Sequence, residues 1–129
     1  MKDKVIVAKT FVINPKGLIL TLRRSNTDPI RPLTWDLPGG EVEYGEDPTE
    51  AVIREAMEEV GLKIENPQIF RVKTTNRAKY VIRLLYYVYA DSEKIKLSYE
   101  HYQYKWVTKE AFSKLDIPEH YLDGLRYLP

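Results

Sequence analysis

The chain has 129 residues, which predicts a single domain spanning residues 1–129 with a core of its own. It has no cysteine, which excludes disulfides and thiolate metal ligands, and its net charge of +1 gives no global positive field that would favour nucleic acid. No stretch approaches the ~20 apolar residues of a membrane span, and the N-terminus lacks a signal-peptide pattern. We therefore expect a soluble, cytoplasmic protein that binds neither nucleic acid nor membrane.

The first third of the chain predicts strands. Lys4–Ile13 is rich in β-branched and aromatic residues, and the turn residues Asn14-Pro15-Lys16-Gly17 follow it. Residues 18–23 (LILTLR) predict a second strand, which would form a hairpin with the first. The pattern then predicts, in order, a polar loop, an extended segment and a short strand at residues 25–32, 35–38 and 41–43.

A helix is expected over Pro48–Val60. Asp47 is a suitable N-cap, Pro48 suits the first helical position, and Glu50 completes a capping box. Gly61 is a natural left-handed C-terminal stop. The local chemistry therefore defines both ends of this helix.

The rest of the chain predicts more strands and then helices. The nearly continuous apolar run at residues 79–90 indicates a central strand covered on both faces. The order of elements is not a regular strand–helix alternation, so it favours an α+β fold with a mixed sheet and helices on both sides. The other strands are expected at residues 68–75 and 102–107, and the helices at residues 108–115 and 118–128.

One face of the predicted helix gathers carboxylates. At 100° per residue, Glu55, Glu58 and Glu59 fall within an arc of roughly 100°, opposite the apolar side chains. Glutamates at these spacings repel one another, and only Arg54 stands among them. The face is either a solvated acidic surface or a site for a cation, and oxygen donors without His or Cys indicate Mg²⁺ or Mn²⁺.

The glycines before the helix offer a second signal. Gly39 and Gly40 carry no Cβ, so their backbone can approach a ligand closely, and a carbonyl there could complete a metal shell. An ordinary glycine turn is the alternative.

Residues 40–62 (GEVEYGEDPTEAVIREAMEEVGL) carry the pattern G-x5-E-x7-R-E-U-x-E-E-x-G-U, where U is aliphatic. Every fixed position is filled, with Ala56 a small residue at the first aliphatic one. The stretch thus resembles the signature of the Nudix hydrolases. The resemblance implies an α/β/α sandwich around a mixed sheet, and hydrolysis of a nucleoside diphosphate linked to a group X.

The resemblance also implies roles for single positions. Arg54 is similar to the arginine that orients a catalytic glutamate, and Glu46 to a glutamate that is usually structural. Glu100 is the candidate for a later carboxylate that binds metal or acts as general base, with a solvated loop glutamate as the alternative. The implied metal ligands are the carbonyl of Gly39 and the carboxylates of Glu55, Glu58, Glu59 and Glu100, with Glu55 or Glu58 also able to activate water.

The substrate is less defined by the sequence. Arg23 and Arg24 are candidates to hold terminal phosphates, or else ordinary surface charges. Trp35 and Tyr80 are candidates to stack on a base, although Trp35 suits the core equally well. We expect a nucleoside triphosphate, oxidised or non-standard ones included, to be cleaved to monophosphate and pyrophosphate. The alternatives are a dinucleoside polyphosphate, a nucleotide sugar, or a non-catalytic nucleotide-binding role, in a monomer or homodimer.

Overall fold

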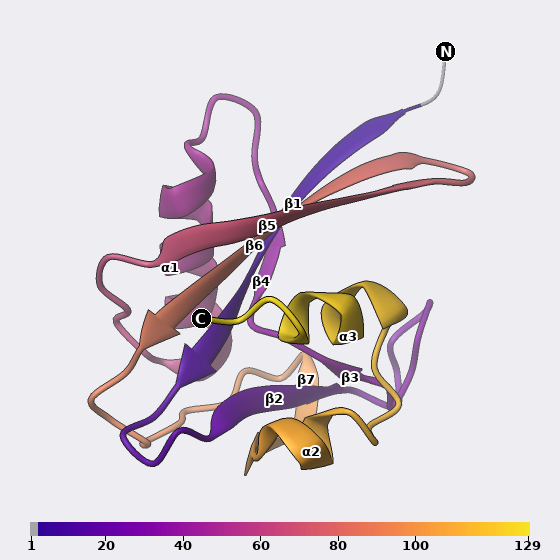
Figure 1. Ribbon diagram of the computed structural model, residues 1–129. Helices are drawn as coiled ribbons and strands as arrows, with labels where there is room; N and C mark the ends of the chain where they lie inside the picture. The colour runs from indigo at the N-terminus through magenta and orange to yellow at the C-terminus, as the bar shows by residue number, and fades with distance from the viewer. Residues whose placement is uncertain (1–2) are drawn as a thin grey trace.

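The structure is a computed structural model that describes residues 3–129 (Figure 1). Strands and helices follow the predicted order, and the sheet is mixed, as predicted. The elements are β1 (Lys4–Ile13), β2 (Ile19–Arg24), β3 (Trp35–Asp36), β4 (Gly39–Glu41), α1 (Pro48–Val60), β5 (Gln68–Asn76), β6 (Tyr80–Tyr89), β7 (His101–Val107), α2 (Lys109–Phe112) and α3 (Glu119–Leu125).

The long strands β1 and β6 form the centre of the sheet. They run parallel over their whole length, from Lys4 opposite Tyr80 to Ile13 opposite Tyr89. The sheet order is β3-β2-β1-β6-β5, with β4 also paired to β1 and β7 to β2, and all these other pairs are antiparallel.

The predicted hairpin of β1 and β2 exists only at its base. The two strands pair at a single position, Ile13 opposite Ile19, after which β2 pairs with β7 and β3. The turn between them forms as expected, because the Asn14 side chain accepts hydrogen bonds from the N–H groups of Lys16 and Leu18. The expectation was wrong beyond the turn because β6 and β4 take the two edges of β1.

The short strand β4 begins earlier than the predicted 41–43 and contains both glycines. Gly39 has φ of +135°, and a Cβ there would lie 2.1 Å from the carbonyl oxygen of Ala8 in β1. A Cβ on Gly40 would lie 2.9 Å from the carboxyl group of Glu55. Strand packing therefore requires glycine at 39, whereas a side chain at 40 would displace the Glu55 carboxyl group.

Helix α1 spans the predicted residues. The Asp47 carboxylate accepts from Thr49 N at 2.8 Å, and Gly61, with φ of +70°, ends the helix through a bond to Met57 O. The division of its faces differs from the prediction, because Glu59 is only 7% exposed whereas Met57 is 47% exposed.

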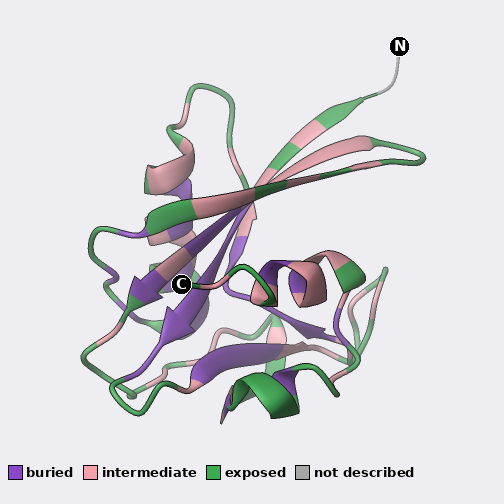
Figure 2. Cartoon of the chain, in the orientation of Figure 1, coloured by how far each residue is buried: buried purple, intermediate pink, exposed green. Residues whose placement is uncertain are grey.

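The core has two parts, one on each face of the sheet (Figure 2). Ala8 and Val12 of β1 face α1, while Phe11 and Ile13 face α2 and α3. Gly124 lets α3 approach the sheet, since a Cβ there would lie 2.6 Å from Leu85. Helices on both sides of the sheet make the predicted sandwich, although α2 and α3 are shorter than expected.

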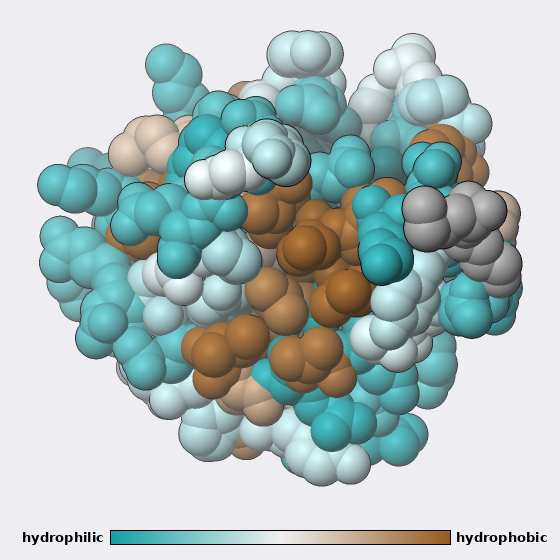
Figure 3. All heavy atoms as spheres, turned by 90° about the horizontal axis from the view of Figure 1, so that it is seen from above, coloured by the Kyte–Doolittle hydropathy of each residue, from teal (hydrophilic) through white to brown (hydrophobic). Residues whose placement is uncertain are grey.

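One end of the sheet projects beyond the helices (Figure 1). The first half of β6 is therefore only half-buried, so the prediction of a strand covered on both faces is wrong there. Nearby strands also expose apolar side chains, including Ile6 and Val72. Viewed from above, apolar side chains gather in the middle of the molecule with polar ones around them (Figure 3). Within residues 3–129, no helix has the length and apolar character needed to cross a bilayer.

Candidate active site

A cleft of about 560 Å³ opens beside β4, between β1, the first half of β6 and the start of α3. Its volume suits a small-molecule ligand. The loop between β2 and β3 and the residues at the start of β7 complete its walls. Carboxylates from five segments line it: Asp28, Asp36, Glu41, Glu55, Glu59 and Glu100.

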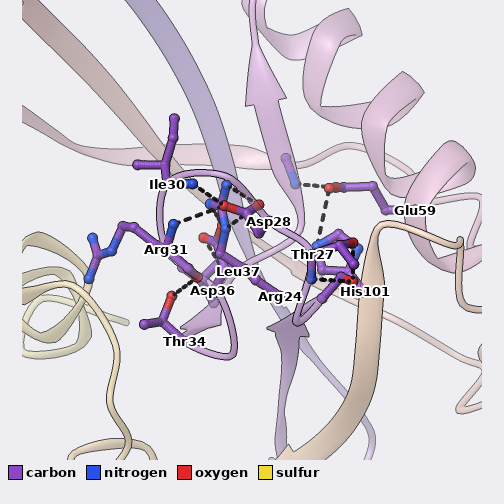
Figure 4. Close-up of polar contacts among 12 residues, drawn as sticks. Arg24, Thr27, Asp28, Ile30, Arg31, Thr34, Asp36, Leu37, Glu59 and His101 are labelled. Atoms are coloured by element: carbon purple, nitrogen blue, oxygen red, sulfur yellow. Dashed lines mark hydrogen bonds and ion pairs between the residues drawn. The ribbon is translucent and has the colours of Figure 1, made fainter.

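Of the three predicted metal-binding glutamates, Glu55, Glu58 and Glu59, the last is the most buried. Its Oε1 accepts a hydrogen bond from Gly39 N at 2.7 Å, and its Oε2 lies 3.8 Å from His101 Nε2 (Figure 4). Burial raises the pKa of Glu59 to about 8, and the charge of Lys9 and the Gly39 N–H only partly offset this effect. Burial therefore favours the protonated form of this carboxyl group in the absence of a cation.

Glu55, which lies on α1 like Glu59, contacts β4 at Gly40. Burial raises its pKa, while the adjacent Arg54 guanidinium, 3.1 Å away, acts in the opposite direction. Glu58 is 58% exposed at its side chain and does not line the cleft. The structure thus places two of the three predicted metal-binding glutamates at the cleft and leaves the third outside it.

Arg54 connects several carboxylates of the Nudix-like signature at residues 40–62. Its Nε and Nη2 donate to the two carboxylate oxygens of Glu46 at 2.8 and 3.0 Å, a bidentate pair. Its Nη1 donates to Glu55 at 3.1 Å and to Glu58 at 3.3 Å. Because one planar group donates hydrogen bonds to three carboxylates, Arg54 sets their relative positions.

A buried lysine on β1 holds the other side of β4. Lys9 Nζ donates to Asp36 Oδ2 at 3.2 Å, and to the carbonyl oxygens of Leu37 and Gly39, each at 3.1 Å. Burial alone would lower the pKa of Lys9, but the negative charge of Asp36 raises it above its usual value. The Gly39 peptide is therefore held at both ends, with its N–H on Glu59 and its carbonyl on Lys9.

The donor set is compatible with a hard divalent ion. Glu55 and Glu59 are desolvated carboxylates with raised pKa values, so a cation would offset the cost of ionising them. In residues 3–129, no group of three or more His, Cys, Asp or Glu side chains lies close enough together to hold a metal ion. The chemistry of the donors suits the metal, but the full ligand set is not gathered.

The predicted substrate-binding residues separate into two groups. Arg24 and Trp35 line the cleft, but Arg24 is paired with Asp28 at 2.9 Å and Trp35 is also part of the core. Arg23 and Tyr80 do not line it. The Arg23 Nε donates to the carbonyl oxygen of Leu33, and Tyr80 lies opposite Lys4 at the projecting end of the sheet. Glu100 lines the cleft, and its role as metal ligand or general base stays a prediction.

The sequence reasoning missed several cleft residues, among them Lys9, Asp36 and His101. Lys9 gave a signal, since it is a single cation inside an apolar strand. Asp36 and His101 gave none, because only tertiary contacts place them beside Lys9 and Glu59.

Comparison with known proteins decides the family. The family model of the NUDIX domain matches residues 3–127. This chain is a Nudix hydrolase. Members of the family generally need a divalent metal, which agrees with the oxygen-rich cleft.

Individual relatives support the assignment. Nucleoside triphosphatase NudI from Enterobacter sp. (strain 638) is 30% identical over 131 residues, covering 92% of each chain. An 8-oxo-dGTP diphosphatase from Buchnera aphidicola subsp. Schizaphis graminum (strain Sg) is 33% identical over 84 residues, which is 65% of this chain and 63% of that protein. The crystal structure of a MutT protein from Methanosarcina mazei Go1 matches with a TM-score of 0.87 at 33% identity, covering 97% of this chain and 92% of the other. The Nudix fold of this hydrolase is thereby confirmed.

Proposed function

We propose that this Nudix hydrolase cleaves nucleoside 5′-triphosphates, including oxidised or non-standard ones, to the monophosphate and pyrophosphate, using Mg²⁺ or Mn²⁺. The observation that carries the proposal is the pair of desolvated carboxylates of α1, Glu55 and Glu59, which lie against β4 at the wall of a cleft of nucleotide size. The printed functions of the two relatives, a nucleoside triphosphatase and an 8-oxo-dGTP diphosphatase, support a triphosphate substrate.

The metal would be held by oxygen atoms of the box and its surroundings. The proposed ligands are the Gly39 carbonyl and the carboxylates of Glu55, Glu58, Glu59 and Glu100. When bound, the ion neutralises charge on the diphosphate and acts as a Lewis acid toward its oxygens.

The protein's own groups would then act on the attacking water. We assign proton acceptance to Glu55, because its raised pKa and its place in the cleft suit a general base. Arg54 orients Glu55 and Glu58, and Glu100, which also lines the cleft, is a second candidate acceptor. Water attacks phosphorus, its proton passes to the carboxylate, and the phosphoanhydride bond breaks to release pyrophosphate.

A substrate panel tests the proposal. The protein is incubated with Mg²⁺ and normal and oxidised dNTPs, dinucleoside polyphosphates and nucleotide sugars, and products are separated by anion-exchange chromatography. We expect pyrophosphate from at least one triphosphate. Tight binding of one nucleotide without hydrolysis of any would instead indicate a nucleotide-binding module. Cytoplasmic location and the choice between monomer and homodimer stay predictions.

A further inference from the structure

Three cations of the cleft have no acidic partner. Arg31, Lys79 and Arg83 all line it. Within residues 3–129, no carboxylate oxygen lies within 4.0 Å of their charged nitrogens. The side-chain partners of Arg83 are neutral hydroxyl groups: its Nη1 donates to Thr75 Oγ1 at 2.8 Å, and it also hydrogen-bonds to the Tyr121 side chain, whose pKa is raised to about 12.

The other cations at the site behave differently. Lys9 and Arg24 both donate to Asp36, and Arg54 is bound to Glu46. The charges of Lys9, Arg24 and Arg54 are therefore neutralised by carboxylates of the protein itself. Those of Arg31, Lys79 and Arg83 are not, so they are available to a ligand.

Tertiary structure brings the unpaired cations to one cleft, and two of them, Arg31 and Arg83, lie close enough to the start of α3 to act on His120. Arg83 lies on β6, Lys79 immediately precedes that strand, and Arg31 extends from the loop between β2 and β3 toward the C-terminal segment (Figure 4). His120 lies at the start of α3, and burial together with the charges of Arg83 and Arg31 lowers its pKa to about 4. His120 is therefore neutral at pH 7 and adds no charge of its own.

Like charges that share a partly enclosed cleft repel one another, and the repulsion is stronger there than in bulk water. A neutral group, such as a base carbonyl, would accept hydrogen bonds but would leave the repulsion in place. A compact anion with several oxygens would satisfy the donors and neutralise the charges together.

We propose that Arg31, Lys79 and Arg83 bind a second anionic, phosphate-like group of the substrate, apart from the diphosphate held at the carboxylates. The inference rests on the proposed function. It favours substrates that carry a phosphate beyond the scissile diphosphate. That group is either the terminal phosphate of a triphosphate or a phosphate on the sugar of the nucleoside.

Matched substrates and variants test this assignment. ATP is compared with ADP-glucose, whose X group is uncharged, and adenosine 3′-phosphate 5′-diphosphate is compared with ADP. In one of these pairs, Arg83→Gln should lower kcat/KM for the phosphorylated member by roughly tenfold or more and change the other by about twofold at most. The control is Arg77→Gln, which changes an exposed arginine outside the cleft. This substitution should leave kcat/KM unchanged for both members of each pair. The pair that responds identifies the source of the phosphate.

Binding without metal separates this inference from the proposed function. Calorimetric titration in EDTA measures the dissociation constants of both members of each pair. In one pair, Arg83→Gln should weaken the binding of the phosphorylated member roughly tenfold more than the binding of the other member. If nothing is hydrolysed but this difference appears, the inference stands and the proposed function fails. If Arg83→Gln and Lys79→Gln, each with a normal thermal melt, affect both members of each pair equally or not at all, the inference is overturned.

Discussion

Replacing Lys9 by Met should destabilise the protein strongly. The ammonium group is buried and donates to Asp36 and to the carbonyl oxygens of Leu37 and Gly39 at 3.1–3.2 Å. Methionine replaces the aliphatic stem but leaves these three acceptors without their donor. Removing one partner of a buried ion pair costs about 3–5 kcal/mol. Since Asp36 keeps Arg24 at 3.1 Å and Leu37 N at 2.7 Å, we expect the low end, about 3 kcal/mol.

Urea denaturation followed by circular dichroism measures this loss as a difference in the free energy of unfolding. The matched control is Lys63→Met at an exposed position, which should change stability by less than about 0.5 kcal/mol. A double-mutant cycle with Asp36→Asn should return a coupling energy of about 1 kcal/mol or more. A loss below about 1 kcal/mol for Lys9→Met, or no coupling, would refute the view that this pair fixes β4.

Three further outcomes are expected at the cleft. Glu59→Gln should lower metal-dependent kcat, measured by pyrophosphate release, by roughly a hundredfold or more while the thermal melt stays normal. The matched control Glu110→Gln, at an exposed position of α2, should leave kcat unchanged. Because the pKa of Glu59 is raised to about 8, Mg²⁺ binding at pH 7 should release a proton, which calorimetry in buffers of different ionisation enthalpy would detect and which Glu59→Gln should abolish. Burial lowers the pKa of His101 and of His120 to about 4, so their contribution to stability is present above the unfolded value near 6.5 and lost as pH falls toward 4. Denaturation in the Glu59→Gln background removes one of the two opposing contributions, because the raised pKa values of Glu59 and Glu55 both act in the opposite direction. A flat profile from pH 7 to 4 in that background would contradict the expected loss.

The elements that were predicted well are defined by neighbouring residues. Helix α1 has its cap at Asp47 and its stop at Gly61, so both ends could be read from the sequence. The hairpin of β1 and β2 could not be judged in this way, because the competing partner of β1 begins at Tyr80, far along the chain. Strand pairing between distant segments leaves no local signal in either segment.

The site shows the same division. Helical periodicity placed Glu55 and Glu59 on one face, yet Glu59 is buried because Gly39 donates to it from β4, a contact that periodicity does not contain. Both Arg23 and Arg24 were candidates for phosphate binding. Successive side chains of a strand point to opposite faces of the sheet, so strand periodicity allows only one of the two to face the cleft. Arg24 lines the cleft and Arg23 does not.

Whether a cation of this cleft supports the fold or is open to a ligand depends on where its acidic partner lies. Arg24 looked suited to phosphate, but Asp28, four residues away, and Asp36 take its donors. Arg83 looked like an interruption of an apolar strand, and no carboxylate of residues 3–129 meets it. An arginine already bound to carboxylates has few donors left for a phosphate, whereas an unpaired arginine in a cleft lowers its energy by binding one. The cations that bind substrate phosphate should therefore be the unpaired ones, whether or not they are close in sequence to the Nudix signature.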